Sequence, residues 1–532
     1  MVGRTHRLGL IAALAGGFFL LFLAGSILPL TTTTVFSSPD ETAVAQFAQE
    51  KVWGWGSGFT ISTGINPYGD LSAIPGLHPR SMVQQKTVLV PVGFLGMPLL
   101  IVPFEWIWGG LGTYVTVLLV LSSAYALFRL VESLGRKAAW AASIVYLTFP
   151  IVILYENRGL FPNLPVVALG LWSFFLIRTQ TKNWSAILGG IAAGMALTIR
   201  PIEAIWLLPW IGYALWSKRR TTRPLMVGIG MAAVCFLGYL MAVKTYGSWL
   251  PTIGYWLRDV LPSPEMKLAS DLSAIPDVSA QHPPSTVQVL PFGIHPRAMW
   301  ANIETYLFGI LGPWVASALA GFAMWGAVRF RKKQSIPWLP IALTGWTAFV
   351  LLLMYGQSRY ADNINQTATI GNSFLRYLLP LVPLIGVGVG LLVESLWNMS
   401  PRKRFLAAGL VGFLAIYGIV VACVRDEEGI FPVRQHLIRY EEIRTVAQAM
   451  LPPGTIVLSE RSDKIFVGLD VVAVSPMPDQ ATLERLAESG ARLALFHRML
   501  TPEQKETFAG GLVKDWLLVS VFENEALYVS RP

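Results

Sequence analysis

The sequence predicts a polytopic α-helical membrane protein that carries a small α/β domain at its C-terminal end. The chain of 532 residues is 54% hydrophobic and only 14% charged. Its apolar residues form uninterrupted runs of about 17 to 25 residues, each able to cross a hydrocarbon core roughly 30 Å thick. Basic residues gather in short loops beside these runs, as they do on the cytoplasmic side of membrane proteins. Beyond about residue 424 the pattern changes to short alternating strands and helices.

We interpret about eleven apolar segments as membrane spans, which together with re-entrant or interfacial helices would form a domain over residues 1–423. The first segment, 8–30, follows Arg4 and Arg7 as a signal peptide would. Its apolar part is too long for a typical signal core, so we expect a retained anchor. The other candidate spans are 112–131, 138–154, 164–179, 184–199, 202–217, 224–244, 302–328, 337–356, 374–396 and 405–423.

The basic residues predict the orientation of this domain. If the N-terminus is cytoplasmic, every strong basic cluster falls in an inner loop, as the positive-inside rule requires. The clusters lie at 136–137, 182, 218–223, 329–333 and 402–404. The outer face then holds two loops, at about 31–111 and 245–301, and the C-terminal domain, 424–532. We therefore expect a multi-pass protein of the cell membrane whose C-terminal domain is extracytoplasmic.

This orientation requires that the apolar stretch 88–108 does not cross the membrane. Prolines and glycines interrupt the stretch, which disfavours a straight helix and favours a re-entrant or interfacial hairpin packed against protein. They are Pro91, Gly93, Gly96, Pro98 and Pro103.

Composition also restricts the function. The net charge of +10 comes largely from loops that flank membrane spans, so no nucleic-acid partner is expected. The two cysteines, Cys235 and Cys423, offer neither a disulfide framework nor a cysteine metal site, and the histidines are scattered without metal-binding spacing. No cofactor is predicted, although a divalent metal stays an open alternative.

The C-terminal segment alternates between strand and helix patterns. A helix-like stretch ends at Leu451, and Thr501 to Gln504 has the spacing of a capped helix start. Strands are expected at 455–459, 471–475 and 491–496, a helix at 481–489, and a closing hairpin at 516–522 and 526–530. The segment shows no glycine-rich phosphate loop and no catalytic triad, so we expect a structural or acceptor-docking role.

An acidic pair, Asp40 and Glu41, follows the first predicted span. Ser38 and Glu41 have capping-box spacing with Pro39 between them, so a helix is expected to begin here and Glu41 to satisfy its amide groups. Asp40 has no such reciprocal role and is the better candidate for a general base. The apolar residues that follow favour a helix that lies in the membrane interface and lines a lipid portal. They are Ala45, Phe47, Ala48 and Val52, followed by Trp53 and Trp55.

These residues resemble the lipid-dependent glycosyltransferases of the C superfamily, which include protein mannosyltransferases and aminoarabinose transferases. Asp40-Glu41 matches the acidic pair in their first outer loop. Arg376-Tyr377-Leu378-Leu379-Pro380-Leu381-Val382-Pro383 looks like the Arg-Tyr-x-x-Pro-x-x-Pro opening of a late helix in those families. A further similar segment is Thr198-Ile199-Arg200-Pro201. The resemblance covers the layout of residues 8–400.

The resemblance implies a polyprenyl-phosphate sugar donor and direct, inverting transfer to a lipid, glycan or protein acceptor on the outer face. Asp40, with Glu41 beside it, would take the acceptor proton, and cations would stabilise the departing lipid phosphate. The available outer-face or chamber cations are Lys86, Arg158, Arg200, Arg297, Arg359 and Arg376, and we favour Arg376 and Arg200. The alternative for each cation is a charge that extends to lipid headgroups.

Some relatives carry a second acid in the next outer loop. Here Asn163 stands at the matching position and Glu156 lies earlier in the same loop, which leaves a second catalytic carboxylate open. Glu156 could pair locally with Arg158, and Glu203 with Arg200.

Two other classes of protein are alternatives to a transferase. A transporter or flippase for a lipid-linked or envelope substrate would place ionisable residues at mid-membrane on broken helices and would often show internal repeats. Here the acids cluster at the outer edges and no convincing repeat is present. A non-catalytic envelope assembly scaffold would use the C-terminal domain to bind partners and would tolerate the loss of Asp40.

Overall fold

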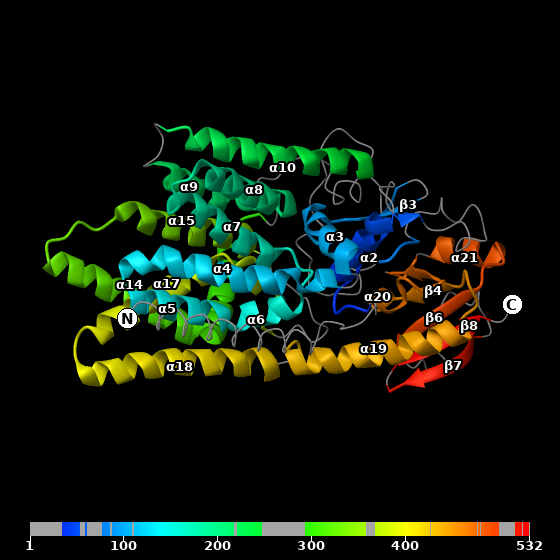
Figure 1. The fold of residues 1–532 in the computed structure, drawn as a ribbon. Coiled ribbons are helices and arrows are strands. Elements are labelled where there is room, and N and C mark those ends of the chain that lie inside the picture. Colours follow the sequence, from blue (N-terminus) through cyan, green and yellow to red (C-terminus); the bar gives the residue numbers. More distant parts are fainter. Residues whose placement is uncertain are drawn as a thin grey trace. The chain divides into compact units, whose positions relative to one another are not determined.

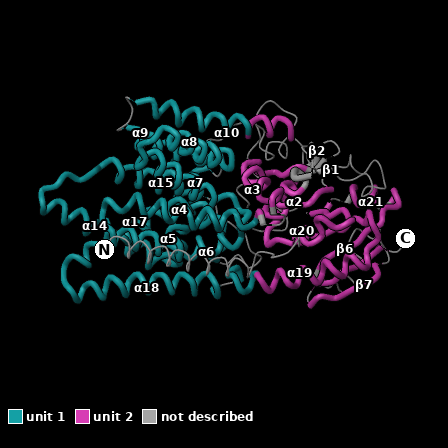
Figure 2. Tube along the Cα trace, viewed as in Figure 1, with its two compact units in different colours: residues 1–28, 113–237, 285–433 teal, residues 29–112, 238–284, 434–532 magenta. Residues whose placement is uncertain are grey.

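The computed structural model describes residues 35–53, 59–60, 77–85, 88–108, 111–216, 221–246, 293–357, 368–425, 427–475, 477–478, 480–498, 516–523 and 525–530. Its contacts divide the chain into two compact units (Figure 2). Unit 1 comprises Met1–Leu28, Thr113–Leu237 and Ser285–Val433, and unit 2 comprises Pro29–Gly112, Gly238–Pro284 and Arg434–Pro532. The first predicted outer loop and the C-terminal segment therefore belong to one unit, a grouping that a sequence boundary at 424 does not anticipate.

Unit 1 is helical in its described part. Its first half contains α4 (Val115–Val131), η3 (Glu132–Leu134), α5 (Arg136–Leu147), α6 (Pro150–Asn157), α7 (Asn163–Arg178), α8 (Asn183–Ile199), η4 (Pro201–Glu203), α9 (Ala204–Trp216) and α10 (Arg223–Tyr246). The last turns of α10 belong to unit 2. Its second half contains α13 (Pro296–Asn302), the π-helix η6 (Ile303–Ile310), α14 (Gly312–Arg331), α15 (Trp338–Tyr355), α16 (Ser373–Tyr377), α17 (Leu381–Trp397) and α18 (Pro401–Val424).

These helices match the predicted apolar segments from 112 onward, while the first predicted span, 8–30, lies outside the described residues. Within the described residues, 4 helices are long and apolar enough to cross a membrane, or up to 6 if each bent pair is one span. The bent pairs are α5 with α6 and the α13–η6 segment with α14. The predicted class, a mostly helical chain with several apolar candidate spans and a small C-terminal sheet, is confirmed. The count of eleven spans stays a prediction.

Helix α17 packs between α5 and α14 (Figure 1), and its glycines lie at both contacts. A Cβ atom at Gly386 would lie 2.9 Å from the carbonyl oxygen of Ala142 on α5, and one at Gly390 would overlap the carbonyl of Ala138. On another face of α17, a Cβ at Gly388 would lie 2.8 Å from Ala318 on α14. Because small residues let helix backbones approach closely, this pattern explains how three apolar helices pack without large side chains between them.

Two glycines of α18 provide a matched test of such close packing. A Cβ at Gly418 would overlap the carbonyl oxygen of Thr148, whereas Gly412 on the same helix has no atom within 4 Å. We expect Gly418→Ala to lower the free energy of unfolding by about 1–3 kcal/mol through overpacking. Gly412→Ala should leave stability unchanged or slightly raised. Thermal unfolding of the two variants in detergent measures the difference. Equal unfolding midpoints would contradict the close approach of α18 to Thr148, at the end of α5.

Unit 2 begins with α2 (Pro39–Trp53) and a small antiparallel sheet. The sheet has the order β1-β3-β2, with β1 (Phe59–Thr60), β2 (Met82–Gln85) and β3 (Val88–Pro91). Next come α3 (Gly96–Trp108) and η2 (Leu111–Tyr114), which continues into unit 1. The stretch 88–108 is thus a strand followed by a helix. As predicted it does not form one straight helix, but its first part pairs in a sheet rather than forming half of an apolar hairpin.

The C-terminal part of unit 2 is a five-stranded sheet with helices on both faces. Strands β5, β4 and β6 are parallel, and β8 and β7 continue the sheet antiparallel in the order β5-β4-β6-β8-β7. The elements are α19 (Ile430–Met450), β4 (Ile456–Ser459), α20 (Asp463–Phe466), β5 (Val472–Val474), α21 (Gln480–Glu488), β6 (Leu493–Arg498), β7 (Trp516–Phe522) and β8 (Glu525–Ser530). The predicted strands, the helix at 481–489 and the closing hairpin are all present, while the helix start at 501–504 lies outside the described residues.

Alternate residues of this sheet enter two different cores, as the pleat of a strand requires. Ile456 and Leu458 of β4 pack with Leu483 and Leu486 of α21. Val457, between them, belongs to the opposite core, which contains Ile443 and Ala447 of α19. That second core also includes residues of the first predicted outer loop, namely Ala43, Phe47, Met82, Val90, Val92 and Leu95.

Helix α2 packs against α3, β3 and α20, and its apolar face enters the core that the C-terminal sheet shares. Phe47 and Ala48 are 0% exposed, and Ala45 is 5% exposed. The expectation that these side chains line a lipid portal is wrong, because the apolar face that they form is covered by protein. A short apolar face has the same sequence pattern whether lipid or a sheet covers it, and only the tertiary fold distinguishes the two.

Candidate active site

The acidic pair lies in the first turn of α2, as predicted. The helix begins at Pro39, and the Ser38 hydroxyl accepts a hydrogen bond from the Asp40 amide at 3.2 Å, which satisfies one of the free N–H groups at this end. The Thr42 hydroxyl donates to the Ser38 carbonyl at 3.0 Å. Ser38 thus caps the helix, and the local structure follows from the Ser-Pro-Asp-Glu order of the sequence.

The two acids have different surroundings. Glu41 is only 2% exposed, and its carboxylate accepts the Ser37 hydroxyl at 2.5 Å. Asp40 is partly exposed, and its carboxylate accepts the Ser81 hydroxyl at 2.5 Å. Glu41 therefore contributes to the packing of the helix start, through Ser37 rather than Ser38. Asp40 is the member of the pair that an external molecule can reach, which suits it better to proton transfer.

The predicted phosphate-binding arginines come together in unit 1. The Arg376 guanidinium lies over the Phe161 ring at 4.6 Å, and the Arg158 guanidinium lies 5.5 Å from the same ring. The Arg200 guanidinium lies over the Tyr377 ring at 4.9 Å, and Arg376 also contacts that ring, at 5.4 Å. We call Arg158, Arg200 and Arg376 the arginine cluster. Each arginine shares an aromatic ring with another, although long stretches of sequence separate them.

Arg200 owes its position to the chain break between α8 and η4. Pro201 disfavours a helical conformation at the preceding residue, and Arg200 is extended with φ −146° and ψ 91°. Its Nε lies 3.3 Å from Glu203, which confirms the predicted ion pair, and its Nη2 donates to the Tyr355 hydroxyl at 3.1 Å. Tyr355 in turn stacks on Tyr377 with ring centroids 4.2 Å apart. Hydrogen bonds and stacked rings thus hold the guanidinium.

The arginine cluster brings three guanidinium groups close together. Glu203 is the carboxylate paired with Arg200, and its other oxygen accepts the indole N–H of Trp206. Arg158 and Arg200 are 8% and 9% exposed, and Arg376 is partly buried. The charge of Arg376 is close enough to act on Arg200. Such a concentration of buried and partly buried guanidinium groups is suited to binding a phosphate, because arginine matches phosphate oxygens in a bidentate geometry.

Other predicted residues have different outcomes. Lys86 and Arg359 lie outside the described residues, so their roles stay predictions. Arg297 is exposed on α13. Asn163 begins α7 and is 5% exposed. Glu156 is fully buried on α6, and in the part of the chain that the structure describes neither of its carboxylate oxygens has a hydrogen-bond partner, so the predicted pairing with Arg158 is wrong.

The aromatic members of the site were not predicted as functional. Tyr377 follows Arg376 directly in the quoted Arg-Tyr-x-x-Pro segment, so the sequence did carry a signal for it. Phe161 and Tyr355 carried none, because a single aromatic residue in an apolar segment is ordinary. The described residues contain no group of three or more His, Cys, Asp or Glu side chains that could hold a metal ion.

Comparison with solved structures identifies the fold. The chain is similar to a crystal structure of ArnT from Cupriavidus metallidurans bound to undecaprenyl phosphate, with a TM-score of 0.58 and 11% identity over 98% of this chain and 97% of that chain. It is also similar to the same protein in the apo state, with a TM-score of 0.55 and 12% identity over 99% and 98% of the two chains. No family model matches, and no curated protein matches. The fold that the sequence resemblance implied is confirmed along nearly the whole chain.

Proposed function

We propose that this chain, which has the fold of the ArnT structures, is an integral membrane glycosyltransferase that takes its sugar from a polyprenyl-phosphate donor. The observation that carries the proposal is the arginine cluster, found in a fold of which one solved example holds undecaprenyl phosphate. A lipid phosphate needs such cations, since its headgroup is anionic and lies at the edge of the bilayer. The acceptor is a lipid, a glycan or a protein of the envelope.

The proposed reaction is a single displacement at the anomeric carbon. Asp40 takes the proton of the acceptor hydroxyl, the acceptor oxygen bonds to the anomeric carbon, and the bond from that carbon to the phosphate oxygen breaks. The polyprenyl phosphate leaves with the bonding electron pair, and the anomeric configuration inverts. No cofactor is needed for this step.

The electrostatic change explains why several arginines are useful. The donor phosphate is a diester with one negative charge, and the departing monoester carries a second charge that develops in the transition state. Cations held in place before the reaction stabilise that developing charge without the cost of reorientation. The stacked rings and the Tyr355 hydroxyl hold Arg200 in this way, and Ser373 holds Arg376 through a hydrogen bond of 3.0 Å.

The orientation follows the positive-inside rule. We propose a cytoplasmic N-terminus, with the acidic pair and the C-terminal sheet on the outer face. An enzyme on that face has no nucleotide sugars, so a donor carried by a lipid is the source of activated sugar that fits.

Label transfer tests this function. Proteoliposomes that contain the full chain should release undecaprenyl phosphate from a panel of radiolabelled undecaprenyl-phosphate sugars when an envelope extract supplies acceptors. The label should move into the lipid, glycan or protein fraction, and the new bond should have inverted anomeric configuration. Vesicles without the protein are the control.

Failure of every donor in the panel to react would reject the transferase and favour a transporter or scaffold.

Labelling of a single cysteine in the same vesicles tests the orientation. The two native cysteines are replaced and Glu488→Cys is introduced at an exposed position of α21. A membrane-impermeant thiol reagent should modify this cysteine from the outer side. The proposed orientation would be contradicted if the reagent modified this cysteine only when it had access to the inner side of the membrane.

A further inference from the structure

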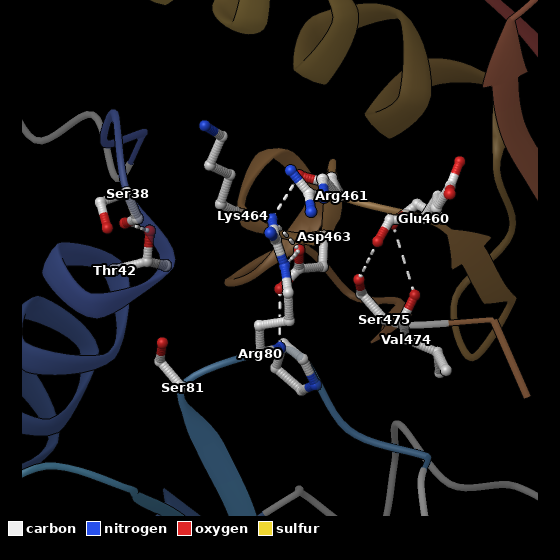
Figure 3. Close-up of polar contacts among 12 residues, drawn as sticks. Ser38, Thr42, Arg80, Ser81, Glu460, Arg461, Asp463, Lys464, Val474 and Ser475 are labelled. Atoms are coloured by element: carbon white, nitrogen blue, oxygen red, sulfur yellow. Dashed lines mark hydrogen bonds and ion pairs between the residues drawn. The ribbon is translucent and has the colours of Figure 1, made fainter. Parts of the chain in front are cut away.

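Helix α20 contacts the segment before α2 through Lys464 and the segment of Arg80 and Ser81 through Asp463. Figure 3 shows the contact between Asp463 and Arg80. The Lys464 ammonium donates to the carbonyl of Ser37, just before α2, at 2.6 Å. Its neighbour Asp463 binds Arg80, which immediately precedes Ser81, the residue whose hydroxyl donates to Asp40. Residues about 400 positions apart in the sequence thus form one polar network within unit 2.

Asp463 holds Arg80 by backbone and side chain at once. The backbone amide of Arg80 donates to Oδ2 of Asp463 at 2.8 Å. The Nε and Nη2 atoms of the Arg80 guanidinium both lie 2.8 Å from Oδ1 of Asp463. Arg80 also donates to the carbonyl of Arg461. The Asp463 side chain is 1% exposed. A buried carboxylate that receives several charge-assisted hydrogen bonds fixes its partners in position, so the backbone of residue 80 has little freedom.

Helix α20 is itself fixed. Phe466 is fully buried and packs on Phe496 of β6, with ring centroids 5.4 Å apart. The Arg444 guanidinium of α19 donates to the carbonyls of Ile465 and Val467 at 2.8 and 2.7 Å. Burial lowers the pKa of Arg444 to about 10, with Glu441 acting in the opposite direction, so this guanidinium still carries its charge at neutral pH. The support for Asp463 is therefore part of the buried core of unit 2.

Ser81 has an unusual backbone conformation, with φ +59°. Glycine is the residue that adopts this left-handed region without cost, and a serine there carries strain. Its hydroxyl donates to Asp40 Oδ1 at 2.5 Å. A strained residue whose side chain binds a candidate catalytic group indicates a functional requirement for that side chain.

We propose that Asp463, Arg80 and Ser81 are positioning residues that hold the Asp40 carboxylate, so that the C-terminal domain takes part in sugar transfer instead of only docking acceptors. This inference rests on the proposed function. The hydroxyl of Ser81 restricts rotation of the Asp40 carboxylate, Arg80 fixes Ser81, and Asp463 fixes Arg80. A base that is misplaced by about 1 Å can lose 10²-fold in rate, so each link should matter for turnover.

Ser81→Gly separates positioning from stability, because the two effects should have opposite signs. Glycine relieves the strain of a positive φ, so the thermal unfolding midpoint should equal or exceed that of the native chain. The hydroxyl is lost, so kcat for label transfer should fall about tenfold or more, with KM for the undecaprenyl-phosphate donor unchanged. A merely structural Ser81 would give unchanged or improved activity in the stabilised variant.

Asp463→Asn tests the far end of the network. It should also lower kcat about tenfold or more with little change in donor KM. Peptides covering residues 80–82 should exchange amide hydrogens faster than in the native chain. The matched control is Arg439→Gln, which breaks an ion pair in the same domain, with Glu523 at 2.5 Å and Glu525 at 3.2 Å. The control should retain both kcat and the exchange pattern of residues 80–82. If Asp463→Asn does not fold, Ser81→Gly decides alone.

The outcomes distinguish this inference from the function on which it rests. If the native chain transfers label and Asp40→Asn does not, but Ser81→Gly and Asp463→Asn keep the native kcat, the positioning role is overturned and the transferase stands. If the native chain transfers nothing, or Asp40→Asn is fully active, the role of Asp40 is rejected and the positioning role is rejected with it.

Discussion

Replacing Asp40 with asparagine is expected to lower the rate of sugar transfer by roughly 10²- to 10⁴-fold, because the amide cannot accept the proton of the acceptor hydroxyl. The substitution keeps the size of the side chain and an oxygen to which the Ser81 hydroxyl can still donate. The fold and the affinity for undecaprenyl phosphate should therefore be unchanged. Initial rates with a labelled donor, together with the thermal unfolding midpoint and a binding measurement, separate a loss of chemistry from a loss of structure.

Glu41→Gln is the control from the same helical turn. Glu41 is buried and accepts the Ser37 hydroxyl, so its replacement should affect stability more than kcat. The assignment of the base to Asp40 would be reversed if Glu41→Gln abolished transfer while Asp40→Asn kept the native rate.

Removing a guanidinium from the arginine cluster is expected to weaken the binding of undecaprenyl phosphate. A hydrogen bond to a charged group contributes about 1.5–3 kcal/mol, so Arg200→Gln or Arg376→Gln should raise the dissociation constant by roughly 10- to 100-fold. Lysine at either position should restore the affinity only in part, because an ammonium lacks the planar fork that binds two phosphate oxygens. Equilibrium binding of undecaprenyl phosphate in detergent micelles measures both effects.

Arg178→Gln is the matched control for this series. Its guanidinium also lies over an aromatic ring, that of Tyr213 at 5.0 Å, but belongs to the same unit outside the arginine cluster. Binding should be unaffected by this change. Native affinity in Arg200→Gln and Arg376→Gln alike would mean that these arginines serve only the packing of unit 1, and the phosphate would have to be bound elsewhere.

The helices of unit 1 could be predicted from the sequence because each apolar run is bounded by basic or helix-breaking residues. The arginine cluster could be predicted only as a set of candidates. Arg158, Arg200 and Arg376 lie beside chain breaks, each followed closely by a proline, and this local feature places them at helix ends. Which of them share a neighbour depends on how the helices pack, and no local pattern records that.

The full set of partners of α2 could not be predicted. The nearby elements β3 and α3 pack against it, but the same core is completed by residues of α20 and the C-terminal sheet that follow more than 350 positions later, such as Phe466 and Phe496. The small sheet in the same region was missed for a related reason. Strand β3 and helix α3 together form one apolar stretch, so the change from strand to helix near Gly93 leaves hydropathy almost constant. The position of α2 and the strand conformation of β3 both depend on burial against other parts of the chain.

The shared core of α2 and the C-terminal sheet has a consequence for biosynthesis. A ribosome that synthesises this chain makes Asp40 early, yet the core that contains Phe47 is complete only after β4, β6 and β8 have emerged, because those strands supply Val457, Phe496 and Leu527. A nascent chain halted after residue 424 would retain every candidate span but leave this core incomplete. The proposed base therefore reaches its final packing only when translation is nearly finished.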